Sequence, residues 1–257
     1  MAHDTARTSD QAWTSDEMMT VAASRELSNG AVCFVGIGLP STAANLARTT
    51  HAPDVVLIYE SGCIGAKPSR LPPSIGDGVL SRTADAVIAV PEIFTYWLQA
   101  GRIDVGFLGA AQVDRMGNIN TTVVGDYQSP TVRLPGAGGA PEIATSCKRI
   151  IITLRHNPRA LVERVDFITS VGHGDGPDAR RRLGLPGAGP QAIITDLGVL
   201  RSDPVSREFM LTSVHPGIEV DEVVRATGWP LRVAPSLMVT APPSVRELAA
   251  LRRFVGA

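Results

Sequence analysis

One carboxylate, Glu60, ends the apolar run of residues 55–59, and two of the smallest residue types follow it. The run has the composition of a strand buried on both faces of a parallel sheet. Open α/β sheets bind ligands at the carboxyl ends of such strands. Because Ser61 and Gly62 leave one face of the carboxylate uncovered, Glu60 is a candidate nucleophile. The alternative is that Glu60 only marks where a buried strand meets solvent, or pairs with a neighbouring arginine.

Two glycine-rich stretches offer bare backbone amides. Residues 134–141 read LPGAGGAP, a short loop bracketed by prolines that favours a rigid turn and can aim N–H groups at an oxyanion or a phosphate. Residues 36–41 read GIGLPS and follow an apolar run, with Glu60 24 positions after Gly36. This stretch approximates a dinucleotide-binding fingerprint, although Ser41 replaces the third small residue. A tight strand-to-helix turn is the simpler interpretation of it.

The remaining candidate groups carry weaker signals. Cys63 could act as a thiol nucleophile, but nothing nearby indicates activation, and a small residue filling space beside the crevice is the favoured interpretation. The histidines are far apart and lack a nucleophile elbow, so no role is assigned to His51, His156, His173 or His215.

Composition excludes several classes of protein. The formal net charge is −1 and aromatic residues make up 5%, which argues against nucleic-acid or membrane-surface binding. Three widely spaced cysteines form neither a disulfide framework nor a metal-ligand set, so no metal is expected. The start of the chain lacks the apolar core of a signal peptide, and no apolar run reaches about 18 residues. We therefore expect a cytoplasmic location and no membrane span.

The order of apolar and helical patterns predicts one α/β domain with a single open, mostly parallel sheet and helices on both faces. We expect a flexible segment over 1–13 and the domain over 14–257. Helices are expected over 18–27, 41–49, 92–100, 219–227 and 243–254, and strands over 31–37, 54–60, 83–90, 102–109, 148–154, 192–200 and 207–214. Gly- and Pro-rich loops are expected over 65–78, 133–142 and 171–190.

Several motifs together resemble the β subunit of class I coenzyme A transferases, glutaconate CoA-transferase type. The resemblance runs from about Met18 to Arg252 and rests on motifs that occur in order: GIGLPSTAANLA (36–47), PDVVLIYESGCIGAKP (53–68), VGFLGAAQVDRMGNINTTVVGDY (105–127), LPGAGGAPEIA (134–144) and DFITSVGHG (166–174). It implies the class I CoA-transferase fold, which is NagB-like. Some relatives on this fold have replaced the glutamate and perform decarboxylation or ring-opening hydrolysis, whereas Glu60 is retained here.

The resemblance implies that Glu60 attacks a thioester and carries CoA as a glutamyl thioester, with succinyl-CoA as donor and 3-oxoadipate as acceptor. Glutaconate or another short dicarboxylate is an alternative acceptor, and an acyl-CoA hydrolase is an alternative activity. The CoA thioester is a substrate, and no permanently bound cofactor is implied. The candidate amides for the oxyanion and thioester are Gly38, Gly138, Gly139 and Ala140. Lys67, Arg70 and Arg133 are weaker candidates for holding the distal carboxylate. The family implies a separate α subunit and a heteromer, for which we expect α2β2.

Overall fold

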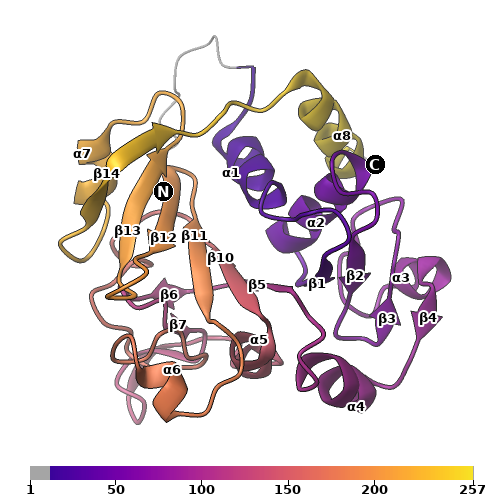
Figure 1. The fold of residues 1–257 in the computed structure, drawn as a ribbon, viewed down its shortest axis with the longest axis horizontal. Helices are drawn as coiled ribbons and strands as arrows, with labels where there is room; N and C mark the ends of the chain where they lie inside the picture. The colour runs from indigo at the N-terminus through magenta and orange to yellow at the C-terminus, as the bar shows by residue number, and fades with distance from the viewer. Residues whose placement is uncertain (1–11, 257) are drawn as a thin grey trace.

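The computed structural model describes residues 12–256, which contain a ten-stranded sheet covered on both sides (Figure 1). The expected flexible segment 1–13 lies outside the described residues except for Ala12 and Trp13. The strand order is β14-β13-β12-β11-β10-β5-β1-β2-β3-β4. The strands are β1 (Val32–Phe34), β2 (Val56–Ile58), β3 (Cys63–Ile64), β4 (Ala86–Val87), β5 (Val105–Gly109), β10 (Arg149–Thr153), β11 (Pro190–Ile194), β12 (Gly198–Ser202), β13 (Phe209–Val214) and β14 (Arg232–Val239).

The five central strands, from β11 to β2, are parallel, and the strands next to them on either side run antiparallel. Two small hairpins lie outside this sheet, β6 (Gln112–Val113) with β7 (Ile119–Asn120) and β8 (Val123–Gly125) with β9 (Pro130–Arg133). The predicted open, mostly parallel sheet is therefore confirmed.

Helices cover the two faces of the sheet in separate groups. Figure 1 shows α1, α2 and α8 on one side and α4 and α5 on the other. The helical segments are α1 (Ser15–Ser24), α2 (Leu39–Thr49), α3 (Gly78–Thr83), α4 (Val90–Glu92), the π-helix η1 (Ile93–Leu98), α5 (Ala140–Ser146), α6 (Ala179–Arg182), α7 (Val220–Arg225) and α8 (Val245–Val255).

Alternation along the central strands divides the core into two layers, because successive side chains of a strand point to opposite faces. In β1, β2 and β10 the residues Phe34, Ile58 and Ile152 pack in the layer beneath η1 and α5. Their neighbours Cys33, Leu57 and Ile151 pack in the layer beneath α1 and α2. These strands are buried on both faces, which is why they read as continuous apolar runs.

Several predicted elements differ from the structure. Of the strand expected over 83–90, only Ala86–Val87 forms a strand, the exposed β4. Thr83 instead ends α3, which Asp77 caps by accepting from the Val79 N–H, and Val90 begins α4. The strand expected over 192–200 is a hairpin of β11 and β12, closed where the Thr195 N–H donates to the Gly198 carbonyl oxygen. The edge strand β14 was not predicted, and α1 ends at Ser24 rather than at residue 27. The helix α5 begins within the predicted loop 133–142, and the predicted loop 171–190 contains α6.

Candidate active site

Glu60 lies in a tight turn at the carboxyl end of β2. The Gly62 N–H donates to the Tyr59 carbonyl oxygen at 3.0 Å, and the Tyr59 N–H donates to the Cys63 carbonyl oxygen at 3.0 Å, so the chain reverses into β3. Gly62 has a φ of 99°, and a Cβ atom there would lie 2.0 Å from the Ile88 carbonyl oxygen. Only glycine fits this position, which explains why it follows the carboxylate so closely.

The alternation of the strand carries Glu60 to the side of the sheet covered by η1 and α5. Ile58 faces this layer and Tyr59 faces the opposite one. Glu60, two residues after Ile58, falls on the same side as Ile58. A Cβ atom built on Gly139 would lie 3.1 Å from Glu60 Oε1 and 2.9 Å from Phe94 Cζ. The structure therefore brings together the predicted nucleophile and the glycine-rich loop, 79 residues apart in sequence.

The Glu60 carboxylate is half-buried. Within residues 12–256 no hydrogen bond or ion pair engages it. A structural carboxylate at the end of a strand would normally accept a hydrogen bond or pair with a cation. The oxygens of Glu60 are instead available to attack an electrophile, as the nucleophile interpretation requires.

The four predicted amide donors differ in availability. No hydrogen bond within the described residues uses the N–H of Gly138 or Gly139, whereas the Ala140 N–H donates to the Ala137 carbonyl oxygen at 3.1 Å. Ala140 is thus the least available member of that loop. Gly38 precedes α2 with a φ of 84°, at the same edge of the sheet as Glu60 because β1 and β2 are parallel neighbours. A Cβ atom built on Gly38 or Gly138 would meet no described residue within 4 Å beyond its chain neighbours, whereas one on Gly139 would lie 3.1 Å from Glu60 Oε1, so Gly139 is the strongest candidate.

Two of the three predicted cations are already paired in this chain. Lys67 Nζ lies 2.5 Å from Asp85 Oδ1, and Arg70 Nη1 lies 2.8 Å from Asp77 Oδ2. The Arg133 guanidinium stacks over the Tyr127 ring, 5.1 Å from its centroid. Arg133 ends β9, just before the glycine-rich loop, and pairs with no carboxylate among residues 12–256. It is therefore the most available of the three for a substrate carboxylate.

A buried arginine that sequence reasoning missed holds α5 in place. Arg180 is 7% exposed, and no carboxylate in the described part of the chain pairs with it. Its guanidinium donates to the backbone carbonyl oxygens of Ala144, Thr145, Val171, Gly172 and Gly187 at 2.8–3.4 Å. Two of these carbonyls end α5, where helix carbonyls lack partners within the helix. An RRR triplet in a loop gives no sequence signal that one arginine is buried.

The turn that carries Glu60 is also tied to α2 from the opposite face of the sheet. The Tyr59 hydroxyl is fully buried, 3.3 Å from Ser41 Oγ, and it accepts a hydrogen bond from Asn45 Nδ2 at 3.3 Å. Burial raises the pKa of Tyr59 despite these hydrogen bonds. Ser41, the position that departs from the dinucleotide fingerprint, is thus buried against Tyr59 instead of facing a phosphate, which favours the structural interpretation of that turn.

His156, His173 and Cys63 are buried and lie in structural positions. His156 bonds the hydroxyls of Thr195 and Thr227 at 3.0 and 2.9 Å, and burial lowers its pKa to about 4. Burial likewise lowers the pKa of His173 to about 4. Cys63 is 3% exposed. No group of His, Cys, Asp and Glu side chains within residues 12–256 is placed to hold a metal ion, and no helix there is long and apolar enough to span a bilayer.

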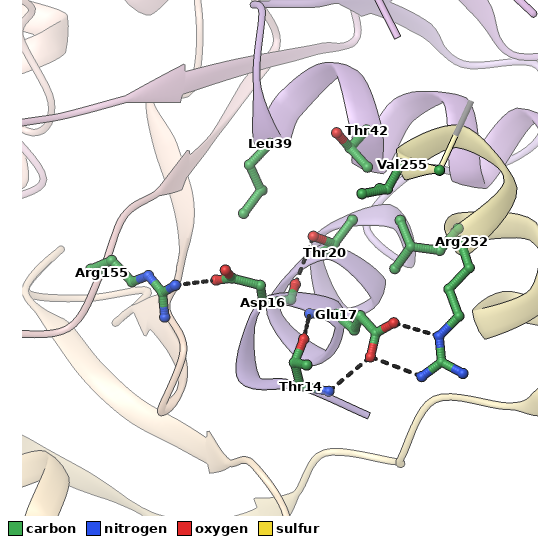
Figure 2. Close-up of a pocket in the computed structure, with 11 residues that line it drawn as sticks. Thr14, Asp16, Glu17, Thr20, Leu39, Thr42, Arg155, Arg252 and Val255 are labelled. Atoms are coloured by element: carbon green, nitrogen blue, oxygen red, sulfur yellow. Dashed lines mark hydrogen bonds and ion pairs between the residues drawn. The ribbon is translucent and has the colours of Figure 1, made fainter. Parts of the chain in front are cut away.

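A separate pocket of about 730 Å³ lies on the other face, between α1, α2 and α8. Figure 2 shows that its charged side chains are paired with one another, Arg155 with Asp16 and Arg252 with Glu17. The remaining lining residues are mainly threonines and aliphatic side chains. The pocket includes neither Glu60 nor any other predicted site residue, so it is not the candidate active site.

A mostly parallel α/β sheet that presents an unpaired carboxylate beside a bare glycine loop fits covalent acyl transfer. The coenzyme A transferase family model matches residues 16–226, and the chain belongs to this family. The resemblance inferred from the motifs is thereby confirmed.

Two relatives span nearly the whole chain. The chain is 64% identical over 241 residues to the β subunit of 3-oxoadipate CoA-transferase from Pseudomonas knackmussii, covering 94% of this chain and 93% of that protein. It is 38% identical to the β subunit of glutaconate CoA-transferase from Acidaminococcus fermentans, covering 92% and 91%.

Solved structures agree with the fold. The crystal structure of glutaconate CoA-transferase from Acidaminococcus fermentans superimposes with a TM-score of 0.89 at 33% identity, covering 95% of both chains. The decarboxylase AibA/AibB superimposes with a TM-score of 0.80 at 28% identity, covering 94% of both chains. The same fold thus supports different chemistry, and the residues of the site must distinguish between these activities.

Proposed function

We propose that this chain is the β subunit of a transferase that moves CoA from succinyl-CoA to 3-oxoadipate, with Glu60 as the covalent nucleophile. The observation that carries the proposal is the 64% identity to the β subunit of a 3-oxoadipate CoA-transferase over 94% of the chain. The position of Glu60, unpaired and beside Gly139, supports its role. Glutaconate is the runner-up acceptor, because one chain of a glutaconate CoA-transferase is 38% identical.

The first half-reaction transfers CoA to the enzyme. A Glu60 carboxylate oxygen attacks the thioester carbonyl carbon of succinyl-CoA. The C–S bond breaks and CoA thiolate is released, so that a mixed anhydride of succinate and Glu60 forms. The thiolate then attacks the Glu60 carbonyl carbon and expels succinate, which leaves a glutamyl-CoA thioester. Splitting the exchange into covalent steps lowers each barrier.

The second half-reaction repeats these steps in reverse. A carboxylate oxygen of 3-oxoadipate attacks the glutamyl thioester and releases CoA thiolate, which attacks the acyl carbon of the new anhydride. The products are 3-oxoadipyl-CoA and the free Glu60 carboxylate. Each addition forms a tetrahedral oxyanion, for which Gly138 and Gly139 are the proposed donors. One such donor typically contributes about 3 kcal/mol to the transition state.

A second polypeptide completes the enzyme in this proposal. Each of the two relatives is named as one subunit of its transferase. Succinate and 3-oxoadipate each carry a second, distal carboxylate, which a cation would bind. Lys67 and Arg70 are neutralised within this chain, so Arg133 or a group from the α subunit is left to supply the charge. We propose an α2β2 assembly and a cytoplasmic location.

Co-expression with the α subunit tests the proposal. The assembled enzyme should transfer CoA from succinyl-CoA to 3-oxoadipate faster than to glutaconate, and the chain alone should be inactive. Faster transfer to glutaconate would favour the runner-up acceptor. Release of succinate and CoA at the full rate without any acceptor would instead indicate an acyl-CoA hydrolase.

A further inference from the structure

Phe94 occupies an unusual backbone position next to the candidate nucleophile. It lies in the π-helix η1, where the Gln99 N–H donates to the Phe94 carbonyl oxygen five residues earlier at 2.9 Å. π-helical turns are rare and are frequent at functional sites. The segment 92–100 predicts only an ordinary apolar helix, so sequence gives no indication that this ring differs from its neighbours.

The Phe94 ring, Gly139 and Glu60 meet at one point. A Cβ atom on Gly139 would lie 2.9 and 3.1 Å from Phe94 Cζ and Cε1, and 3.1 Å from Glu60 Oε1. The edge of the ring and the carboxylate oxygen are therefore within about 6 Å of each other. Behind this edge the ring packs against Phe34, with ring centroids 6.4 Å apart, and against the core layer beneath α5. The Phe94 side chain is therefore half-buried, with part of its ring packed against the core.

We propose that Phe94 is the apolar wall that keeps water away from acylated Glu60. This inference rests on the proposed function. Water attacking the glutamyl thioester would add hydroxide to the Glu60 carbonyl carbon, break the C–S bond, and yield the Glu60 carboxylate, CoA thiol and a proton. The same attack on the mixed anhydride would release free acid. Both reactions waste the thioester, and excluding water from a closed site prevents such side reactions.

The position of the Phe94 ring fits exclusion of water better than recognition of the acid substrates. Phe94 offers no hydrogen bond to a carboxylate or an amide, so it cannot orient the acid substrates through polar contacts. The aromatic edge itself offers water no polar partner, so beside the carboxylate on that side only the Gly138 and Gly139 N–H groups could bind a water, whereas water needs two to four partners to be held. Water is therefore disfavoured where the acyl group must lie.

The test compares hydrolysis with transfer in the co-expressed complex. With succinyl-CoA, free thiol is measured without acceptor and acyl transfer is measured with 3-oxoadipate. Phe94→Ala should raise the ratio of hydrolysis to transfer by about tenfold or more, whereas Phe94→Leu should stay within about threefold of wild type because it keeps apolar bulk. Tyr96→Ala is the matched control, since Tyr96 lies on the same π-helix but is 57% exposed, and its ratio should not change.

Two results would overturn the inference. One is an unchanged ratio in Phe94→Ala when the wild-type complex transfers CoA normally. The other is an equal rise in Tyr96→Ala. If Phe94→Ala does not assemble, Phe94→Gln keeps much of the side-chain volume but replaces the apolar edge with a polar group, and an unchanged ratio in that variant also refutes the proposed exclusion of water by Phe94. Failure of the wild-type complex to transfer CoA to any acceptor would instead refute the proposed function, and the inference would fail with it.

Discussion

Replacing Gly139 with alanine tests whether Glu60 and the glycine-rich loop must lie as close as they do here. The added Cβ atom would lie 2.9 Å from Phe94 Cζ and 3.1 Å from Glu60 Oε1. Non-bonded carbon atoms prefer about 3.5–4.0 Å, so the ring or the loop has to move by about 0.5–1 Å. The backbone of Gly139 has a φ of −83°, which alanine adopts freely. The effect of the substitution therefore arises from contact and not from backbone strain.

The expected result is a larger loss of turnover than of stability. Overpacking of this kind typically costs about 1–3 kcal/mol. A displacement of about 1 Å at a reacting group costs about 100-fold in rate. We expect kcat for CoA transfer to fall by about 100-fold and the free energy of unfolding to fall by about 1 kcal/mol. Steady-state kinetics of the assembled complex and denaturant unfolding measure the two quantities.

A matched control separates this contact from a general effect of losing a glycine. Gly76 lies in an exposed loop, has no positive φ, and a Cβ atom there would approach no atom closer than 3.8 Å. Gly76→Ala should keep wild-type kcat. A Gly139→Ala enzyme with undiminished kcat would refute the proposed proximity of the loop and the nucleophile, as would an equal loss in Gly76→Ala.

Further substitutions address stability. Arg180→Met should lower the free energy of unfolding by about 3 kcal/mol or more, because buried carbonyl oxygens lose a charged donor. Arg181→Met should change the free energy of unfolding by less than about 0.5 kcal/mol, since the Arg181 side chain is 80% exposed. Equal shifts of the two variants in denaturant unfolding would show that Arg180 does not hold α5. Burial lowers the pKa of His156 from 6.5 to about 4, so its contribution to stability is present above pH 6.5 and is lost as the pH falls towards 4. The slope is about 1.4 kcal/mol per pH unit. His156→Gln should therefore show a shallower fall across this range, and a profile parallel to wild type would contradict the assignment.

The sequence predicts the centre of the fold better than its edges. Strands β1, β2, β5 and β10 are buried on both faces, so hydrophobic burial alone makes them visible as continuous apolar runs. At the edges the signal fails, because β4 is exposed and β14 is mostly exposed. The single strand expected over 192–200 divides at a turn that Thr195 closes, and the apolar residues on both sides of it hide the break.

The sequence likewise predicts some residues of the candidate site and misses others. The carboxylate at the end of a buried strand and the bare glycine loop are recognisable from residue type, and the structure places Glu60 and Gly139 together. Phe94 and Arg180 are not recognisable, because an aromatic residue in an apolar helix reads as core and an arginine in a loop reads as surface. Their roles depend on contacts between segments tens of residues apart, which no local pattern records.

The proposed covalent role of Glu60 is tested most directly by the intact mass of this chain in the assembled complex, incubated with succinyl-CoA and no acceptor. If Glu60 carries CoA as a thioester, the chain gains the mass of CoA less one water, the adduct maps to the peptide containing Glu60, and hydroxylamine removes it. Glu60→Ala should show no adduct and no transfer. Absence of the adduct from the wild-type chain, or its persistence in Glu60→Ala, would contradict the central claim that Glu60 carries CoA.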